Sequence, residues 1–242
     1  MHTQGLNLLI PDKPDQERDA LAAEFALLGG TVHRLARFWD PPPLPPETIR
    51  VYGPDSFCLV LQQKLGLSLY SPDDDMLMRV PPALLRRDVF TDTLAGAKNR
   101  TWPAFIKPVV PKQFRGALYA SAAALAEECR GLSPDTGVLV SEIVRFTSEV
   151  RCFVLHDAVL DAAVYEGRAE LPEAIQFATA VAQTIELPHS VVIDVGHIAG
   201  RGWGVVEFNA AWGAGLNGCD PKKVLPAILA ASQSDSEPLK PA

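Results

Sequence analysis

The chain has 242 residues, of which 48% are apolar and 21% charged, a composition typical of globular proteins and not of disordered or low-complexity chains. Its formal net charge of −7, with no basic stripe, argues against nucleic acid as the main partner, although a few lysines and arginines could still bind a small anion. The chain lacks both a signal-peptide pattern and an apolar run of the roughly 18–20 residues that span a bilayer, so we expect a cytosolic protein.

The first hundred residues alternate between strand and helix patterns. Four short apolar runs are typical of strands, at residues 6–10, 31–38, 49–52 and 67–70. Two segments with helical spacing separate them, at residues 14–28 and 53–65. This order predicts a small parallel sheet covered by helices, in an N-terminal α/β domain that ends at residue 99.

The second half, residues 100–232, has a different pattern. Its predicted strands lie at residues 104–109, 137–144, 149–155, 158–165, 190–195 and 203–209. Its predicted helices lie at residues 118–129, 173–185 and 222–231. His156 and Asp157 form the predicted turn of a strand pair, and we expect residues 233–242 to be a flexible tail.

Acidic and amide side chains lie at the ends of two of these strands. Because alternate residues of a strand point to the same side, we expect Glu207 and Asn209 to project together while Val206 and Phe208 face the core. Asp194 ends the preceding strand and comes near Glu207 if the two strands pair antiparallel. Such oxygen-bearing side chains can hold a hard cation such as Mg²⁺. A pair of capping or hydrogen-bonded carboxylates explains the spacing equally well.

Lys107 ends an apolar strand, where a lysine is unfavourable unless it meets an anion or faces a cavity. Lys112 and Arg115 follow in the next loop, and three cations within nine positions of an acidic protein are typical of an anion-binding site. The alternative is an edge lysine in solvent, followed by loop charges.

Arg151 shares one face of its predicted strand with Glu149 and Phe153. An inward arginine beside a magnesium–phosphate site is a natural donor to a transferring phosphoryl group or to a carboxylate substrate. The alternative is a cross-strand ion pair between an arginine and a glutamate.

Other patterns are better explained without a cofactor. Residues 213–218 match GxGxxG, but Pro221 and the short remaining chain leave no room for a dinucleotide-binding unit, so we expect a loop whose N–H groups face an anion. Asp73 to Asp75 are expected to be a solvated helix start. We expect the four cysteines to be buried thiols, and the five histidines have no zinc-binding spacing.

Taken in chain order, these motifs resemble the ATP-grasp superfamily of carboxylate–amine ligases. The matching segments are Phe105-Ile-Lys-Pro, Val140-Ser-Glu-Ile-Val, Glu149-Val-Arg-Cys-Phe-Val-Leu-His-Asp, Asp194 and Glu207-Phe-Asn. Residues 102–221 are similar to the catalytic part of ribosomal-protein glutamate ligases, and the whole chain is similar to a compact branch of ATP-grasp proteins. The resemblance implies an α/β protein in which a small parallel α/β domain precedes two α+β lobes that hold the nucleotide between them.

The resemblance also implies roles for individual residues. Lys107 would contact the ATP phosphates, Lys112 would belong to the loop that covers them, and Arg151 would steady the acyl phosphate and the transferring phosphoryl group. The adenine would be read by the hinge between the lobes, at Glu142, Ile143 and Val144. The magnesium ligands would be Asp194, Glu207 and Asn209.

The chain departs from the family pattern in places. A second phosphate-binding lysine is usual before the Lys107 strand; here the region offers Arg86, Arg87, Lys98 and Arg100, and Arg87 is our first choice. The phosphate-covering loop, residues 109–116, is stiffer and more basic than usual, and Ala-Ala-Trp-Gly follows Asn209 in place of the usual Ser-Pro. These changes affect the substrate pocket more than the nucleotide pocket.

We therefore expect an ATP- and Mg²⁺-dependent ligase that joins the carboxylate of a small molecule or peptide to an amine through an acyl phosphate. Lys107 and Arg151 would be its catalytic residues. Two alternatives remain, a nucleotide-binding module without ligase turnover and a phosphotransferase that stops at a phosphorylated product.

Overall fold

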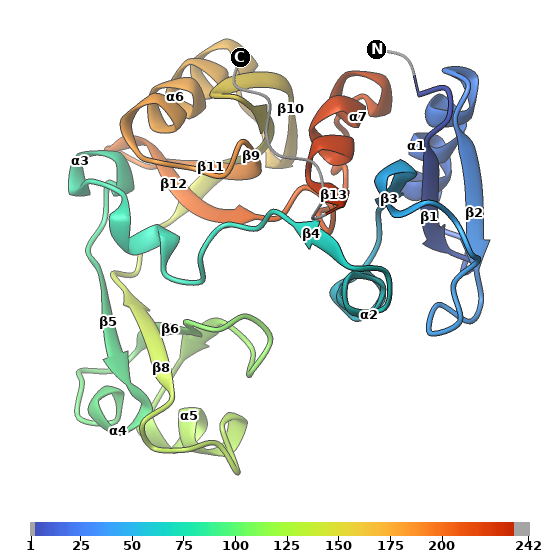
Figure 1. Cartoon of the computed structure of the whole chain (residues 1–242). Helices are drawn as coiled ribbons and strands as arrows, with labels where there is room; N and C mark the ends of the chain where they lie inside the picture. Colours follow the sequence, from blue (N-terminus) through green and yellow to red (C-terminus); the bar gives the residue numbers. More distant parts are fainter. Residues whose placement is uncertain (1–2, 235–242) are drawn as a thin grey trace.

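The computed structural model describes residues 3–234 and contains four β-sheets with helices packed on them. Three groups of elements are visible in Figure 1: an N-terminal domain in blue, a small lobe mainly in green and a large lobe in yellow to red. The mixed α/β class expected from the sequence is confirmed. No helix within the described residues is both long enough and apolar enough to cross a membrane.

The N-terminal domain is built on a parallel sheet, as predicted. Its strands are β1 (Asn7–Pro11), β2 (Thr31–Leu35) and β3 (Ile49–Val51), in the order β2-β1-β3. Helix α1 (Gln16–Leu27) is capped by Asp15, whose side chain accepts a hydrogen bond from the Arg18 N–H. Helix α2 (Asp55–Leu65) ends at Gly66, which adopts the left-handed conformation at φ +62°.

Strand β4 (Leu67–Leu69) differs from the prediction. It does not join the parallel sheet and instead pairs antiparallel with β13 (Ser232–Ser234). One reason that β4 stays outside the parallel sheet is that β13 contacts its edge strand β3, where the Val51 N–H donates to the Ser232 Oγ, 3.1 Å away. The start of the predicted tail thus belongs to a strand, while residues 235–242 lie outside the described residues.

The small lobe contains an antiparallel sheet of order β5-β8-β6-β7, with two short helices. These elements are β5 (Val89–Thr93), α4 (Leu94–Ala97), β6 (Ala104–Pro108), β7 (Ala117–Tyr119), α5 (Ala122–Glu128) and β8 (Gly137–Ser141). The helix predicted from residue 118 begins four residues later, because β7 pairs with β6 and Ser121 caps the helix by accepting from the Ala124 N–H. The domain boundary at residue 99 stays a prediction; β5 precedes it yet pairs with β8.

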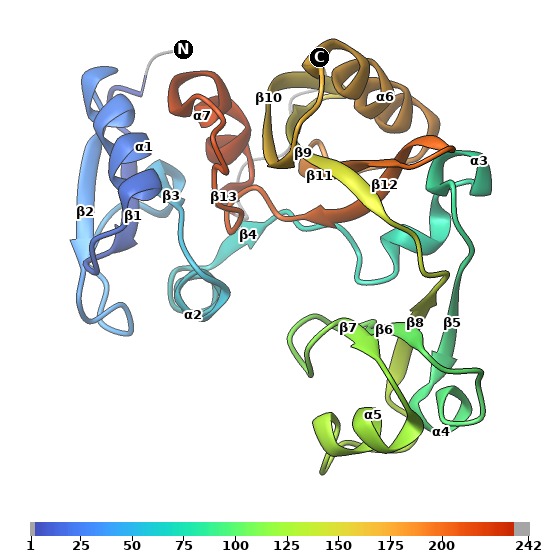
Figure 2. The same ribbon diagram turned by 180° about the vertical axis from the view of Figure 1, so that it is seen from behind.

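The large lobe contains a second antiparallel sheet, of order β10-β9-β11-β12, and two helices. They are β9 (Phe146–Leu155), β10 (Ala158–Gly167), α6 (Leu171–Thr184), β11 (Ser190–Ile198), β12 (Gly202–Asn209) and α7 (Pro221–Ala230). Figure 2, the view from behind, shows α6 and α7 beside this sheet, and they pack on its opposite faces, since α7 shares a cluster with Phe153 and α6 shares another with Cys152. The short helices η1 (Pro46–Thr48), η2 (Met76–Arg79) and α3 (Pro82–Leu85) lie in the connections. The turn predicted at His156 and Asp157 is confirmed, since both residues have positive φ.

A β-bulge in β12 changes one expectation. Asp194 pairs with Glu207, as predicted for antiparallel neighbours, but the next pair joins Val195 to Val205 and leaves Val206 as the extra residue. Val205 is therefore buried in the core of the large lobe. Val206 lines a cavity, and the prediction that it faces the core is wrong. Phe208 does pack against that core.

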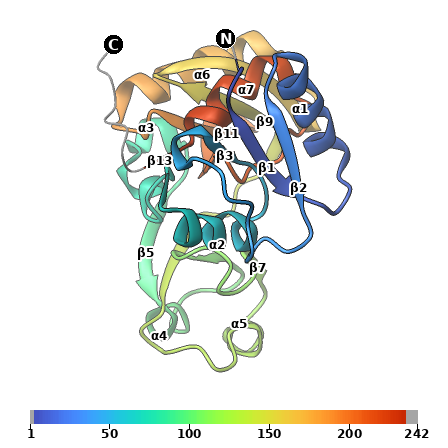
Figure 3. The same ribbon diagram turned by 45° about the vertical axis from the view of Figure 1, so that its right-hand side comes forward.

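Three hydrophobic clusters hold the parts together. The first joins the N-terminal domain to the large lobe, because Leu9 and Phe25 share it with Phe153 of β9 and Ile228 of α7. The second lies under α6. The third is confined to the small lobe, which stands apart from the large lobe in Figure 1 and lies below α2 in Figure 3. The small lobe thus has its own core, while the other two parts share one.

Candidate active site

Two adjoining cavities lie between the lobes. The larger, of about 710 Å³, reaches from β6 of the small lobe to α2 of the N-terminal domain. The smaller, of about 260 Å³, lies at the connection between the lobes. Lys107 of β6 and Glu207 of β12 line both cavities. The cavities are therefore two parts of one cleft that meet at this pair.

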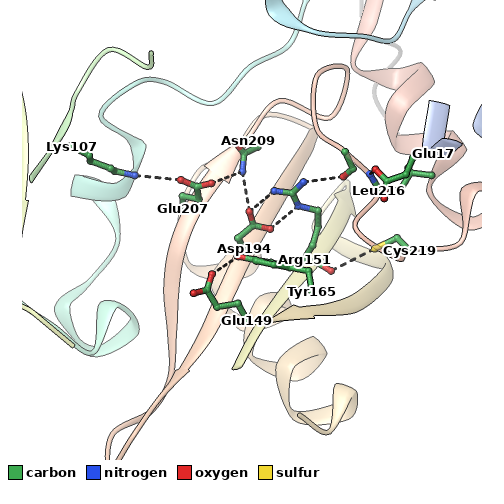
Figure 4. Close-up of polar contacts among 11 residues, drawn as sticks. Glu17, Lys107, Glu149, Arg151, Tyr165, Asp194, Glu207, Asn209, Leu216 and Cys219 are labelled. Carbon is green, nitrogen blue, oxygen red and sulfur yellow. Dashed lines mark hydrogen bonds and ion pairs between the residues drawn. The ribbon is translucent and has the colours of Figure 1, made fainter. Parts of the chain in front are cut away.

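The predicted acid trio converges at this point. Figure 4 shows the Asn209 side chain between two carboxylates, and its Nδ2 donates to the Asp194 Oδ2 at 3.1 Å and to the Glu207 Oε1 at 3.2 Å. Asp194 has a side chain only 1% exposed, and this burial raises its pKa although the hydrogen bonds from Arg151 act in the opposite direction. Glu207 and Asn209 thus line the larger cavity, while Asp194 lies buried behind them and lines neither cavity.

Arg151 of β9 binds Asp194 with two parallel hydrogen bonds. Its Nε donates to Oδ1 at 2.9 Å and its Nη2 to Oδ2 at 2.7 Å, which is the geometry expected of a strong arginine–carboxylate pair. Its Nη1 donates to the Gly215 carbonyl at 2.9 Å. The ion pair considered from the sequence therefore exists, but its acid is Asp194 on the neighbouring strand and not a glutamate.

Lys107 reaches the trio from the other lobe. Its Nζ lies 3.6 Å from the Glu207 Oε2, and its side chain is 25% exposed. The prediction that it faces a cavity is confirmed. The Lys107 amine and the Glu207 carboxylate lie on opposite walls of the cleft. A ligand bound between them would therefore contact a cation on one side and an anion on the other.

The cations of the following loop do not join Lys107. Lys112 is 68% exposed, and its Nζ lies 2.5 Å from the Asp55 Oδ2 at the start of α2. Arg115 points to Glu128 with a separation of 3.9 Å. Lys112 still lines the larger cavity, on the side of the N-terminal domain. The three cations thus do not form one cluster.

The hinge residues Glu142, Ile143 and Val144 line the smaller cavity together with Arg87. Both carboxylate oxygens of Glu142 accept from Arg201, at 2.6 and 2.8 Å, and this contact together with the Asp88 N–H lowers the Glu142 pKa to about 2. The Glu142 side chain is therefore engaged by the protein itself.

Two groups near the trio were not singled out from the sequence. Tyr165 of β10 donates to Glu149, and its ring lies 5.8 Å from the Arg151 guanidinium. Burial raises the Glu149 pKa, and the hydrogen bond from Tyr165 acts against that shift. The available signal was a tyrosine at the end of a strand predicted to pair with the one that carries Glu149, although Tyr165 itself lies at an irregularity of that pairing, between Val164 and Glu166.

The second such group is Glu17 of α1. Its Oε2 accepts from the Leu216 N–H at 2.8 Å, in the glycine loop that we expected to face an anion. That anion is a side chain of the N-terminal domain, 199 positions away in sequence. No local pattern marks such a contact.

The acidic run before η2 is exposed. Asp73 and Asp75 form ion pairs with Arg79, the last residue of η2, and Asp73 and Asp74 also line the larger cavity. All four cysteines are buried and free, as expected.

The trio is chemically suited to a divalent cation. Its donors are carboxylate and amide oxygens, the ligands that Mg²⁺ takes in proteins. Burial is the main cause of the raised Asp194 pKa, and the Glu207 carboxylate is close enough to add to it. Nowhere in residues 3–234 do three histidine, cysteine, aspartate or glutamate side chains gather as a metal site, and here the third member is Asn209. The amide must turn its oxygen towards the ion, which requires only rotation about its last torsion.

Solved structures share this arrangement of elements. A RimK domain protein ATP-grasp from Sphaerobacter thermophilus has a TM-score of 0.59 at 14% identity, over 93% of this chain and 100% of that chain. N5-carboxyaminoimidazole synthetase from Staphylococcus aureus, complexed with ADP, has a TM-score of 0.58 at 12% identity, over 94% and 78%. The ATP-grasp ligase PsnB, complexed with a minimal precursor, has a TM-score of 0.55 at 14% identity, over 93% and 98%. These similarities show the ATP-grasp fold.

The sequence comparison gives the family. No curated protein matches the chain. Residues 84–227, more than half of the chain, match the family described as ATP-grasp domain, R-2-K clade family 2. The chain therefore belongs to this clade family of ATP-grasp proteins.

Proposed function

We propose that this protein is an ATP- and Mg²⁺-dependent ligase that joins a carboxylate to an amine through an acyl phosphate. One observation carries the proposal: Lys107 and Glu207 meet across the cleft at 3.6 Å, and Asp194, Asn209 and Arg151 are linked to Glu207 by hydrogen bonds behind it. A lysine opposite a carboxylate–amide trio suits a magnesium-bound phosphate chain, because one wall supplies a cation for phosphate and the other supplies oxygen ligands for a metal.

The two cavities divide the substrates between them. The smaller cavity, lined by Glu142, Ile143 and Val144, would take the adenine, and Lys107 would contact the phosphates where the cavities meet. The larger cavity, of about 710 Å³, would take the acid and the amine. Lys112, on the wall of that larger cavity, is the proposed contact from the phosphate-covering loop.

Asp194, Glu207 and Asn209 would hold the metal. Mg²⁺ bound there would offset the negative charge of the phosphates during transfer. Arg151 orients Asp194 through two hydrogen bonds, and it lies close enough to the trio to stabilise charge on the group being transferred. Without the ion, Asn209 donates to both carboxylates and so keeps them side by side.

The proposed reaction has two steps. A carboxylate oxygen attacks the γ-phosphorus, the bond to the β–γ bridging oxygen breaks, and ADP leaves. The amine nitrogen then attacks the acyl carbon, the acyl–oxygen bond breaks, and phosphate leaves while the nitrogen loses a proton. Lys107 contributes a cation to the first step, in which negative charge moves between oxygens.

Proteins of the same fold support this class of reaction. The solved structures of this fold include a ligase complexed with a precursor peptide and AMPPNP and a synthetase complexed with ADP. The acid and the amine are accordingly proposed to be small molecules or peptides, and the cleft volume admits either.

The test is an acyl-phosphate trap. The full chain is incubated with ATP, Mg²⁺, hydroxylamine and a panel of amino acids, dicarboxylates and short peptides, and both phosphate and hydroxamate are measured. We expect phosphate release that requires both Mg²⁺ and a carboxylate, with hydroxamate formed, and we expect its loss in the Glu207→Ala, Asn209→Ala double variant. The exposed Glu127→Ala is the matched control.

The other outcomes separate the alternatives. Binding of ATP with no hydroxamate across the panel would contradict the ligase and support a nucleotide-binding module. A phosphorylated product that resists hydroxylamine would support a phosphotransferase, because only an acyl phosphate yields a hydroxamate. Lys107→Ala is expected to weaken ADP binding in calorimetry, whereas Lys64→Ala, in the exposed last turn of α2, is not.

A further inference from the structure

Arg87 is a buried arginine at the junction of the two lobes. It is 8% exposed and lies just before β5. Its Nε donates to the Ser141 Oγ of β8 at 3.2 Å, within the small lobe. Its Nη1 and Nη2 donate to the carbonyls of Val205 and Val206 of β12, at 2.6 and 3.3 Å, within the large lobe. One guanidinium thus connects the two sheets that form the cleft.

The two carbonyls belong to the β-bulge of β12. Val205 pairs with Val195 while Val206 has no partner in the register, and the hydrogen-bond ladder of a sheet is locally disrupted at such a position. Buried backbone carbonyls need donors, and Arg87 supplies one to each of these residues. Nη1 also donates to the Leu85 carbonyl at 3.2 Å, which fixes the guanidinium in place.

The bulge determines where Glu207 points. In a regular strand Val205 and Glu207 would share one face, because they are two residues apart. Here Val205 is fully buried in the core while Glu207 faces the cleft, and the extra residue Val206 makes both orientations possible. Without the bulge, either Val205 would leave the core or Glu207 would leave the cleft.

We propose that Arg87 is a positioning residue that holds the β12 bulge and thereby aims Glu207 at the metal site. The inference rests on the proposed function and replaces our expectation that Arg87 is the second cation on the ATP phosphates. Four hydrogen bonds within the protein already engage the guanidinium. Arg87 would influence Glu207 by holding the backbone of β12, because its N–H groups donate to that strand and not to the Glu207 side chain.

Gly204 gives a second way to disturb the same contact. A Cβ atom at this residue would lie 2.6 Å from the Leu85 carbonyl oxygen and 3.3 Å from the Arg86 Cβ. Alanine at 204 therefore pushes the segment that carries Arg87 away from β12 without removing the arginine. A positioning role and a phosphate-binding role for Arg87 predict different effects of Arg87→Lys and Gly204→Ala on nucleotide binding.

The experiment measures ADP binding to the full chain by calorimetry, with Mg²⁺ and with EDTA. If Arg87 positions Glu207, Arg87→Lys keeps the charge but cannot reach both lobes, so the gain in affinity from Mg²⁺ falls by about 10–100-fold while metal-free ADP affinity is unchanged. Gly204→Ala should give the same pattern. Arg130→Lys, an exposed arginine away from the cleft, should behave like the unaltered protein.

Three results would overturn the inference. Equal weakening with and without Mg²⁺ in Arg87→Lys would mean that Arg87 contacts the phosphates. Unchanged binding in Gly204→Ala, with the variant folded, would remove the bulge from the argument. Absence of Mg²⁺-dependent ADP binding in the unaltered protein would reject the proposed function as well. Thermal unfolding of each variant identifies a misfolded one, and Gly204→Ala still decides the question if Arg87→Lys does not fold.

Discussion

Arg151 and Asp194 form the most buried ion pair of the site, with side chains 11% and 1% exposed. Two charges removed from water are costly, and the pair is acceptable because two parallel hydrogen bonds and the Gly215 carbonyl engage the guanidinium. Removing one partner leaves the other charged and buried. The pair therefore contributes to the folded state as well as to the site.

Arg151→Met should lower the free energy of unfolding by about 3–5 kcal/mol, measured by urea denaturation, because it leaves Asp194 unpaired in the interior. The control is Arg130→Met, whose partner Glu127 is exposed on helix α5. That surface pair should contribute at most about 0.5 kcal/mol. Equal losses in the two variants would contradict the account of burial.

Glu142 gives a prediction about pH. Its pKa is lowered from 4.5 to about 2, mainly by the hydrogen bond from Arg201. Because the folded value lies below the unfolded one, the stabilisation is fully present above pH 4.5 and is lost as the pH falls towards 2. An NMR titration should place the Glu142 midpoint near 2, and Arg201→Gln should raise it. A midpoint unchanged by Arg201→Gln would refute the assignment.

At this scale the sequence predicted several residues that the structure brings together at the cleft. Lys107, Glu207 and Asn209 could be found because a charged or amide group in an apolar strand needs a partner. Glu17 could not, because its contact depends on where a distant helix packs, whereas Tyr165 was missed although its strand was predicted to pair with the one that carries Glu149. Arg87 was identified as relevant, but its partners are backbone carbonyls that no spacing rule reveals.

At the scale of elements, the alternation of side chains along a strand predicts their orientation only where the strand pairing is regular. The β9–β10 hairpin was predictable because two apolar runs flank a two-residue turn. The β12 bulge was not, since a two-residue period carries no information about an inserted residue. Strand β4 was assigned to the wrong sheet because its partner, β13, lies more than 160 residues later.

The hairpin turn allows a test of its backbone. Asp157 has φ +63°, a left-handed conformation that costs a β-branched residue about 1–2 kcal/mol. Asp157→Val should therefore lower the free energy of unfolding in urea by about that amount. Asp157→Gly, which tolerates positive φ, should be close to neutral. Equal destabilisation by valine and glycine would contradict this account of the turn.

At the scale of the whole molecule, the hydrophobic clusters show which parts of the protein pack together. The N-terminal domain and the large lobe share one hydrophobic cluster, which includes Leu9, Phe153 and Ile228, while the small lobe has its own. The cleft therefore lies between two parts that share one core and a lobe that has a core of its own. Arg87 and the Lys107–Glu207 contact are among the links across it.

Ile228→Ala should remove buried surface from the shared core and lower its stability by about 2–5 kcal/mol. Hydrogen exchange should then accelerate in both β1 and β9, because both strands contribute to that cluster, and not in β8 of the small lobe. Leu125→Ala, in the small-lobe core, should have the reverse effect. Acceleration confined to β1 after Ile228→Ala would show that the N-terminal domain unfolds alone.

The central claim is that Lys107 and the acid trio hold one nucleotide and its metal between them. The most direct measurement is the anomalous scattering of Mn²⁺ in crystals of the full chain grown with ADP. The account predicts a manganese peak bound by the Glu207 carboxylate and the Asn209 side chain next to Asp194, with the ADP phosphates between that peak and the Lys107 Nζ. A peak away from these three residues, or phosphates out of reach of Lys107, would contradict it.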